Sequence, residues 1–245
     1  MREQDCLRAS WVPVIATLLA ALLFVAPAHA EAPFSHAAFT TVLAKYVDVR
    51  GNVDYKGIVA DPAGLDRYLA GVSAASPRSH PERFPTRNDT LAYYLNAYNA
   101  FAIRGVTQRP GITTVDAVKE AFFVTSTWQM GGTPVTLQAL ENDIVRKQFP
   151  DPRVHFALNC QSAGCPRLPQ EAFDPARLDA QLEGYTREFC TDPANVRVEA
   201  GVAHVSQIFE WYAGDFSAAG GSVAFINAHG GKIPVGAKLA FIPYD

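Results

Sequence analysis

The segment Asp89–Val106 constrains the fold most, because it predicts a helix that is apolar around nearly its whole circumference. It contains LAYYLNAYNAFAIRGV, in which large apolar and aromatic side chains fall on every face of a helix with 3.6 residues per turn. Such a helix is stable in water only when other elements cover it, so we expect it to be buried. Asp89 or Thr90 can cap its first turn.

The rest of the chain predicts helices mixed with short hairpins, without the regular alternation of a βαβ fold. Further helices are predicted at 34–46, 61–75, 115–122, 137–149, 174–190, 207–216 and 223–229. Hairpins are predicted within 46–55, 123–136 and 196–205, a buried central strand at 153–159, and a last strand at 238–242. We therefore expect an α+β fold, a single compact domain of helices around a small, mostly antiparallel sheet built from short hairpins.

The first 30 residues predict a cleavable secretory signal peptide. Two arginines precede an uncharged apolar run at 11–28, WVPVIATLLAALLFVAPA, which contains two prolines. The run ends in Ala28-His29-Ala30, the small-x-small pattern that a signal peptidase cleaves. A retained membrane anchor is the alternative, but the prolines shorten the uninterrupted apolar part and no basic cluster follows it. We expect cleavage after Ala30, and a single globular domain at 31–245 that is periplasmic or secreted.

Composition and short patterns exclude several function classes. The chain carries 21 Lys and Arg against 24 Asp and Glu, a formal net charge of −3. It has no basic stripe with interleaved aromatic residues, so no nucleic-acid partner is expected. Beyond residue 30 no apolar run is long enough to span a bilayer, so no membrane span is expected after signal cleavage. The short patterns of nucleotide-binding, zincin and α/β-hydrolase sites do not occur, and no cofactor is expected.

Three cysteines remain after the predicted cleavage, because Cys6 lies in the signal peptide. Cys160 and Cys165 are separated by a short loop that contains glycine, and are close enough to form a disulfide in an oxidising compartment. An odd number of cysteines leaves at least one free thiol unless chains are cross-linked. Cys190 lies on a predicted amphipathic helix, and we expect a buried, unreactive thiol there.

The segment VHFALNCQSAGCP at 154–166 is the strongest candidate for chemistry. On a strand, His155 and Asn159 would point to the same side, and Cys160 would lie at the strand's end beside a cleft. An imidazole can activate a neighbouring thiol as a nucleophile, and N–H groups of the following loop could stabilise an oxyanion. The alternative is that Cys160 and Cys165 cross-link the loop, with His155 as a hydrogen-bonded core residue.

Two other segments place polar groups in predicted helices. Asn96 and Asn99 are three residues apart on one helical face, so both amides point into the same region. If buried, they must bond either to backbone loops or within a polar pocket. In LENDIVR, Glu141 and Arg146 are five residues apart, which is not an ideal spacing for partners on an α-helix. Each is free to reach another group, and His155 is one candidate.

Five ordered segments resemble the family catalogued as domain of unknown function 547. They are GNVDY at 51–55, YYLNAYNA at 93–100, LENDIVR at 140–146, HFALNCQSAGCP at 155–166 and SQIFEWYAGDF at 206–216. The likeness extends over nearly all of the chain beyond the predicted signal peptide. The family recurs in exported bacterial proteins and in eukaryotic multidomain proteins, and the resemblance implies no established activity.

The resemblance implies which positions belong to the site. The residues that match the family's pattern are Asn96, Tyr98, Asn99, Glu141, Arg146, His155, Cys160, Ser162 and Cys165. Two places differ from it. The family usually has a His directly after the Glu, where this chain has Asn142, and its common ending Tyr-Asp-Trp-Ser-Leu-Asn corresponds here to Tyr244-Asp245.

Three hypotheses for function remain open, and whether the protein is an enzyme stays open with them. The first is a binding or scaffold domain with a Cys160–Cys165 disulfide, whose polar residues hold buried loops or a ligand. The second is a thiol-dependent hydrolase or acyltransferase, mechanistically like papain or transglutaminases. The third is a metal site of Glu141, His155, Cys160 and Cys165, although the C-x₄-C spacing is not that of common zinc motifs.

All three hypotheses place the chemistry at one cluster of residues. In the enzyme hypothesis, Cys160 is the nucleophile and His155 the base. Either Glu141 or Asn159 would orient that base, and Asn96 or Asn99 would contact the oxyanion or the substrate. The binding residues predicted are Asn96, Tyr98, Asn99, Arg146, Asn159 and Ser162. From the expected compartment, the candidate ligand is a cell-envelope peptide or protein.

Overall fold

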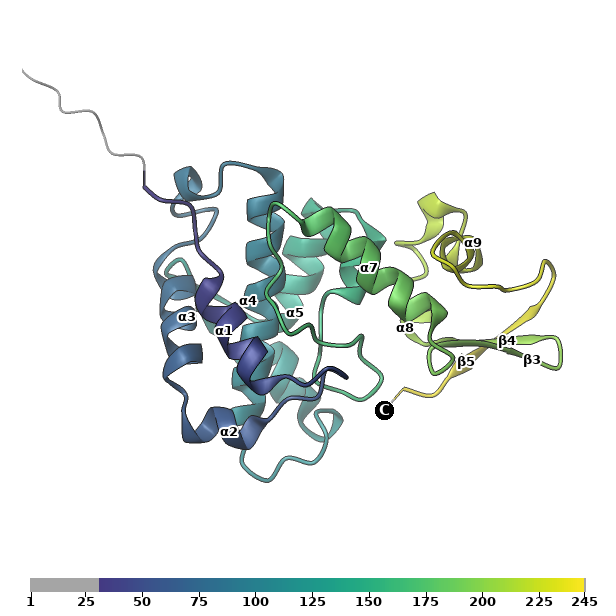
Figure 1. The fold of residues 1–245 in the computed structure, drawn as a ribbon, viewed down its shortest axis with the longest axis horizontal. Helices are drawn as coiled ribbons and strands as arrows, with labels where there is room; N and C mark the ends of the chain where they lie inside the picture. The colour runs from purple at the N-terminus through teal and green to yellow at the C-terminus, as the bar shows by residue number, and fades with distance from the viewer. Residues whose placement is uncertain (1–30, 245) are drawn as a thin grey trace, which may run out of the picture. The chain divides into compact units, whose positions relative to one another are not determined.

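The computed structural model describes residues 31–244, and the predicted signal peptide lies outside them. The α-helices are α1 (Ala37–Tyr46), α2 (Tyr55–Ala60), α3 (Ala63–Ala74), α4 (Arg87–Thr107), α5 (Leu137–Ala139), α6 (Arg146–Gln148), α7 (Leu178–Thr191), α8 (Ile208–Trp211) and α9 (Ser222–Ala228). The strands are β1 (Trp128–Met130), β2 (Thr133–Val135), β3 (Val196–Glu199), β4 (Val202–Ser206) and β5 (Lys238–Ile242). This is an α+β domain, mostly helical, which confirms the predicted fold class (Figure 1).

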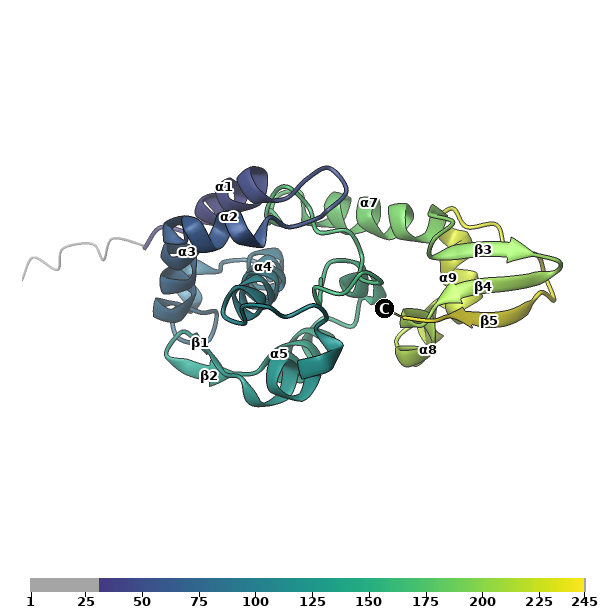
Figure 2. The ribbon, with the colours of Figure 1, turned by 90° about the horizontal axis from the view of Figure 1, so that it is seen from below.

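The predicted central helix is confirmed as α4. Every side chain from Leu91 to Ile103 is buried. Figure 2 views α4 nearly end-on, with α1, α3, the β1–β2 hairpin and α5 arranged around it. Its cap is Thr86, rather than the predicted Asp89 or Thr90. The Thr86 hydroxyl accepts the Asp89 N–H and the Asp89 carboxylate accepts the Thr86 N–H, a capping box that begins the helix earlier than expected.

The sheets are small and lie away from the centre of the helical part. β1 and β2 form an antiparallel hairpin. The second sheet has the order β3-β4-β5, in which β3 and β4 are antiparallel and β4 and β5 are parallel. Its β4 side chains Ala203 and Val205 are buried in a second apolar cluster, separate from the one around α4. The aromatic members of this cluster are Phe156, Phe189, Phe209, Phe216 and Phe225.

The predicted buried strand at 153–159 is wrong. Pro152–Phe156 forms a 3₁₀ turn, η5, and an irregular loop follows it. The Asp151 carboxylate accepts the Arg153 N–H, and Pro152 occupies the first turn. An acidic cap followed by proline favours the start of a helical turn, and this signal outweighs the short, mostly apolar run from which a strand is predicted. His155 and Asn159 therefore do not share the face of a strand.

Three other predicted elements are shorter than expected or differ in type. The helix predicted at 115–122 is a 3₁₀ turn, η2 (Asp116–Val118), followed by a π-helix, η3 (Glu120–Thr125). The helix predicted at 207–216 ends at Trp211, and Gly214 in the remaining stretch is a poor helix former. The hairpin predicted at 46–55 reduces to a single bridge between Val47 and Val53.

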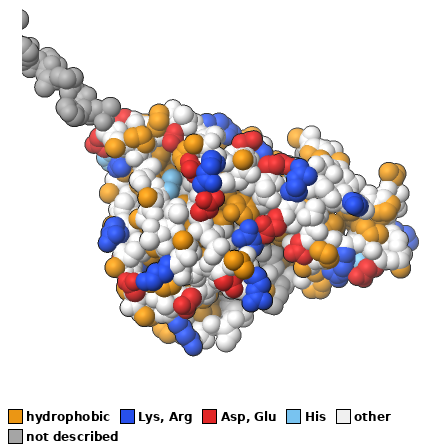
Figure 3. Space-filling view, in the orientation of Figure 1, with side chains coloured by type: hydrophobic (Ala, Val, Ile, Leu, Met, Phe, Trp, Pro, Cys, Tyr) orange, Lys and Arg blue, Asp and Glu red, His pale blue; other side chains and the backbone are white. Residues whose placement is uncertain are grey.

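The surface of the described residues carries both signs of charge. Figure 3 shows Lys and Arg side chains interspersed with Asp and Glu on the face in view. Several form ion pairs, such as Arg153 with Asp151 and Asp179. None of the helices within 31–244 has both the length and the apolarity needed to cross a bilayer.

Two buried amides on α4 attach loops to the central helix. The Asn96 amide donates to the carbonyl of Phe173 and accepts its N–H, both at 2.8 Å. Asn99 donates to the carbonyl of Ala157 and accepts the N–H of Asn159, both at 2.9 Å. Each amide thus satisfies two backbone groups that no secondary structure would otherwise pair.

We predict that Asn99→Ala lowers the free energy of unfolding by about 2–4 kcal/mol, because it leaves two backbone groups without a partner. Urea denaturation followed by circular dichroism measures this loss. Asn88→Ala, in the first turn of the same helix, is the control: its exposed amide makes one longer hydrogen bond, to the Pro175 carbonyl at 3.3 Å, so the loss should be less than about 1 kcal/mol. Equal losses in the two variants would show that the Asn99 amide does not anchor the loop.

Candidate functional site

A cavity of about 570 Å³ lies where four of the five segments that resemble the family meet, those at 93–100, 140–146, 155–166 and 206–216. Side chains from α4, both π-helical segments, the disulfide loop, α8 and the C-terminal end line it. Those with polar or reactive groups include Tyr98, Glu141, His155, Cys160, Tyr212 and Tyr244. Six of the predicted site residues line this cavity.

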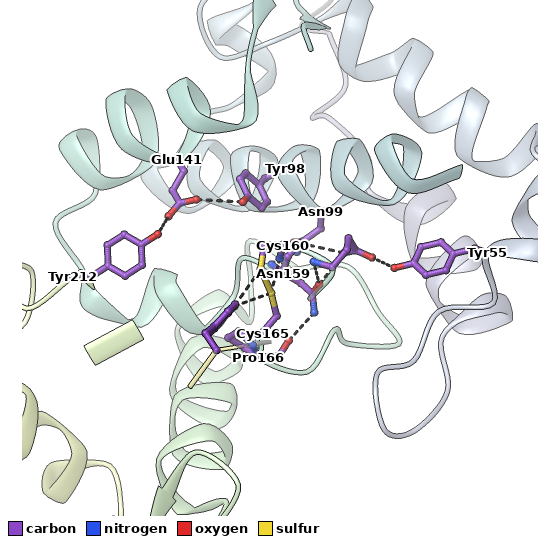
Figure 4. The surroundings of a disulfide bond; sticks show 11 residues. Tyr55, Tyr98, Asn99, Glu141, Asn159, Cys160, Cys165, Pro166 and Tyr212 are labelled. Carbon is purple, nitrogen blue, oxygen red and sulfur yellow. Dashed lines mark hydrogen bonds between the residues drawn. A yellow bond between two sulfur atoms is a disulfide. The ribbon is translucent and has the colours of Figure 1, made fainter. Parts of the chain in front are cut away.

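Glu141 is an acid at the wall of this cavity that two tyrosine hydroxyls hold in place. The Tyr212 hydroxyl donates to its Oε1 at 2.5 Å, and the Tyr98 hydroxyl donates to its Oε2 at 3.2 Å (Figure 4). Protein atoms surround the carboxyl although it reaches the cavity surface, and this desolvation raises the pKa of Glu141. The two tyrosine hydrogen bonds act in the opposite direction, because they stabilise the ionised form.

A π-helical turn, η4 (Leu140–Val145), positions Glu141. The N–H of Arg146 donates to the carbonyl of Glu141, a bond that spans five residues instead of four. Residues five apart therefore lie on the same side of the turn, and the Arg146 guanidinium lies 4.8 Å from the centre of the Tyr212 ring. The spacing that is poor for an α-helix is suitable for a π-helix, so both Glu141 and Arg146 reach Tyr212.

Arg146 and His155 meet at Asp215. Arg146 donates to both Asp215 oxygens, at 2.7 and 2.9 Å, and the His155 Nε2 lies 2.8 Å from Oδ2. Because a carboxylate only accepts, Nε2 carries the proton. The imidazole also stacks on Tyr212 with 3.9 Å between ring centroids. Arg146 thus contacts His155 through Asp215.

The charges of this group are set mainly by Arg146 and by burial. The Arg146 guanidinium is the largest cause that holds the pKa of Asp215 below its usual range, so Asp215 is an anion. Burial lowers the pKa of His155 to about 4 despite the adjacent carboxylate. His155 is therefore neutral at pH 7.

Cys160 and Cys165 form a disulfide at the wall of the cavity (Figure 4). The Tyr244 hydroxyl lies 3.2 Å from each sulfur. A Cβ atom at Gly164 would lie 2.9 Å from the Tyr244 ring, so the ring packs on the loop only because this residue is glycine. Cys190 is a buried free thiol, as predicted, and burial raises its pKa to about 12.

Hydrogen bonds within the disulfide loop fix its conformation. Gln161 has a positive φ of 68°, which is unusual for a residue other than glycine. The Tyr55 hydroxyl donates to its side-chain oxygen at 2.5 Å, and its N–H donates to the Asn159 side chain at 2.8 Å. Asn159 also donates to the carbonyl of Pro166 at 2.7 Å. The amide of Asn159 is thus used inside the loop.

The predicted site residues fall into two groups. The first group lines the cavity and consists of Tyr98, Glu141, His155, Cys160, Ser162 and Cys165. The second group bonds to the elements around it and consists of Asn96, Asn99, Arg146 and Asn159. No group of three His, Cys, Asp or Glu side chains within 31–244 lies close enough together to bind a metal ion, so the four residues of the metal hypothesis are not a ligand set.

Sequence reasoning missed Trp211, Tyr212, Asp215 and Tyr244. The first three lie in the matched segment SQIFEWYAGDF, but no short-range pattern shows that Trp211 and Tyr212 line the cavity or that Asp215 contacts His155. Tyr244 matches the start of the family's common ending. The resemblance was thus the available signal for all four.

The comparisons with known proteins agree with the resemblance. Residues 82–190 match the model of a family described as "Protein of unknown function, DUF547". This range includes α4, η4 and the disulfide loop, whereas Tyr212, Asp215 and Tyr244 follow it. Neither the curated proteins nor the solved structures contain a match to the chain.

We predict that stability falls as the pH is lowered from about 6.5 to about 4, in part through His155. In this range the unfolded chain binds a proton at His155 and the folded chain does not, so His155 contributes a loss of up to about 1.4 kcal/mol per pH unit. His155→Gln keeps an N–H for Asp215 and should remove this contribution. Urea denaturation at pH 7 and pH 5 measures the difference.

Burial also lowers the pKa of His36 to about 4, so His36 adds a similar dependence of the free energy of unfolding on pH. Only the difference between the variant and the wild type therefore reports on His155. His36→Gln should remove the contribution of His36, and adding His155→Gln to that variant should lower the pH dependence further by the same amount as in the wild type. A His155→Gln slope parallel to that of the wild type would contradict a buried, neutral imidazole.

Proposed function

We propose that this chain, which carries a DUF547 domain over residues 82–190, is an exported binding domain whose cavity takes a peptide-sized ligand of the cell envelope. The observation that carries the proposal is the cavity of about 570 Å³ on which Glu141, Tyr98 and Tyr212 converge. Cavities of a few hundred Å³ with a few placed polar groups are the usual form of small-ligand sites.

The rigidity of the lining supports this proposal. Glu141 is positioned by two tyrosine hydroxyls, and the disulfide loop is fixed by Tyr55 and by its own amides. A site whose side chains are already ordered loses little conformational entropy when a ligand binds. In the oxidising compartment that we expect, the Cys160–Cys165 bond is a stable part of the wall.

A second candidate function is the thiol-dependent hydrolase or acyltransferase, which the His155–Asp215 pair favours. A carboxylate on Nε2 orients the imidazole and leaves Nδ1 as a base, the arrangement that accompanies nucleophilic thiols. Cys160 and His155 line the same cavity. Because the sulfur of Cys160 is in a disulfide, this function requires a dithiol reductant that supplies two electrons and two protons to release both thiols.

We predict one free thiol, that of Cys190, when the exported protein is purified without reductant, unfolded and counted with Ellman's reagent. Cys190→Ala should lower this count to zero. Three thiols in the unfolded wild type would contradict the disulfide. A second measurement distinguishes the enzyme from the binding domain. After reduction of the native protein, Cys160 is alkylated at pH 6 in the wild type and in Asp215→Asn. Fast alkylation in the wild type that is lost in the variant would favour the enzyme.

We predict that at least one class in a panel of tripeptides, each with a free and with an acetylated amino terminus, raises the melting temperature of the exported protein. The panel includes acidic, basic, aromatic and aliphatic side chains at millimolar concentration. Val124→Trp, which fills part of the cavity, should abolish the shift. Val59→Trp, at a valine that is 58 % exposed on α2, is the matched control and should retain it. No shift with any peptide would contradict the proposed function.

A further inference from the structure

Within residues 31–244, the Glu141 carboxylate has hydrogen-bond partners but no ion-pair partner. It accepts the two hydroxyls of Tyr98 and Tyr212, and among residues 31–244 it forms no ion pair. Arg146, on the same turn, is bonded to both oxygens of Asp215. A desolvated carboxylate is unfavourable unless it is paired with a cation. A positively charged group of a ligand in the cavity would supply the ion pair that Glu141 lacks.

Aromatic rings form another part of the cavity wall. Trp211, Tyr244 and Phe123 line the cavity, and the rings of Trp211 and Tyr244 lie 4.7 Å apart between centroids. Trp211 is 52 % exposed, so about half of its surface is left open by the protein's own side chains. The faces of such rings attract ammonium groups, and the effect is largest for tryptophan. The ring of Tyr212 is already packed against His155 and Arg146, so this residue offers the cavity its hydroxyl and not the face of its ring.

The charges of the lining favour a cation over an anion. The charged side chains that line the cavity are Asp116, Lys119, Glu120 and Glu141. Lys119 forms an ion pair with Asp116 at 3.1 Å, which leaves Glu120 and Glu141 without a balancing charge. An anionic ligand would be repelled by these carboxylates, whereas a cationic ligand would be attracted.

We propose that the cavity binds its ligand through an ammonium group, which donates hydrogen bonds to the Glu141 carboxylate and lies against the rings of Trp211 and Tyr244. This inference rests on the proposed function and names the class of ligand. In a peptide, the group is either a lysine side chain or a free amino terminus. The burial that raises the pKa of Glu141 also means that a bound cation stabilises its ionised form.

Isothermal titration of the exported protein at pH 7.5 with three probes tests the proposal. Nα-acetyl-lysine methylamide carries a side-chain ammonium, norleucine methylamide carries a terminal ammonium, and Nα-acetyl-norleucine methylamide has neither. We expect one or both ammonium probes to bind at least about tenfold more tightly than the uncharged probe. A hydrogen bond to a charged group contributes enough free energy to give this ratio of affinities. The probe that binds identifies the source of the ammonium.

Glu141→Gln keeps the shape of the side chain and removes its charge. It should therefore lower the affinity for the ammonium probe at least about tenfold. Asp143→Asn makes the same charge change on the same turn at an exposed position, and should change the affinity less than about twofold. Equal effects in the two variants would overturn the role of Glu141. If Glu141→Gln does not fold, the three probes still decide the proposal on the wild-type protein.

Failure of this inference differs from failure of the proposed function. If the uncharged probe binds as well as both ammonium probes, or if only acidic tripeptides raise the melting temperature, the cavity is a binding site but its ligand is not a cation. If none of the probes or tripeptides binds, the proposed function itself fails and the inference fails with it.

Discussion

The attachment of the disulfide loop to α4 is the constraint on which the rest of the site depends. Asn99 is buried on the central helix and bonds to the backbone on both sides of Leu158, at the point where the chain leaves η5. This places His155 and Cys160 beside the segment that carries Tyr98. An amide fits this role because it both donates and accepts, and both backbone groups would otherwise be buried without a partner.

The site separates its charges into two groups that share Tyr212. On one side, Arg146, Asp215 and His155 form a group in which the carboxylate is fully engaged. On the other side, the Glu141 carboxylate accepts only hydroxyl groups. Tyr212 bonds to Glu141 and packs against both Arg146 and His155. Arg146 is thus kept from pairing with Glu141, which leaves that carboxylate available to a ligand.

Much of the fold could be predicted from local patterns, whereas the site depended on contacts that no local pattern encodes. The central helix is evident because its apolar side chains cover all faces. Since Asn96 and Asn99 lie within it, both buried amides are expected to have hydrogen-bond partners. The segment 153–159 predicts a strand where the chain forms a 3₁₀ turn at 152–156, because a short, mostly apolar run fits a buried strand and a buried helical turn equally well. The π-helical turn changed which residues face Tyr212, and Asp215 reaches His155 from 60 positions further along the chain.

The central claim is that Glu141 is a desolvated carboxylate whose missing partner is a cation. A carbon-13 NMR titration of the Glu141 carboxyl, assigned with Glu141→Gln, measures this directly. We predict a pKa above the usual range of glutamate in the free protein, and a lower pKa when the ammonium probe that binds more tightly is present at saturating concentration. A pKa in the usual range that the probe does not change would contradict the claim.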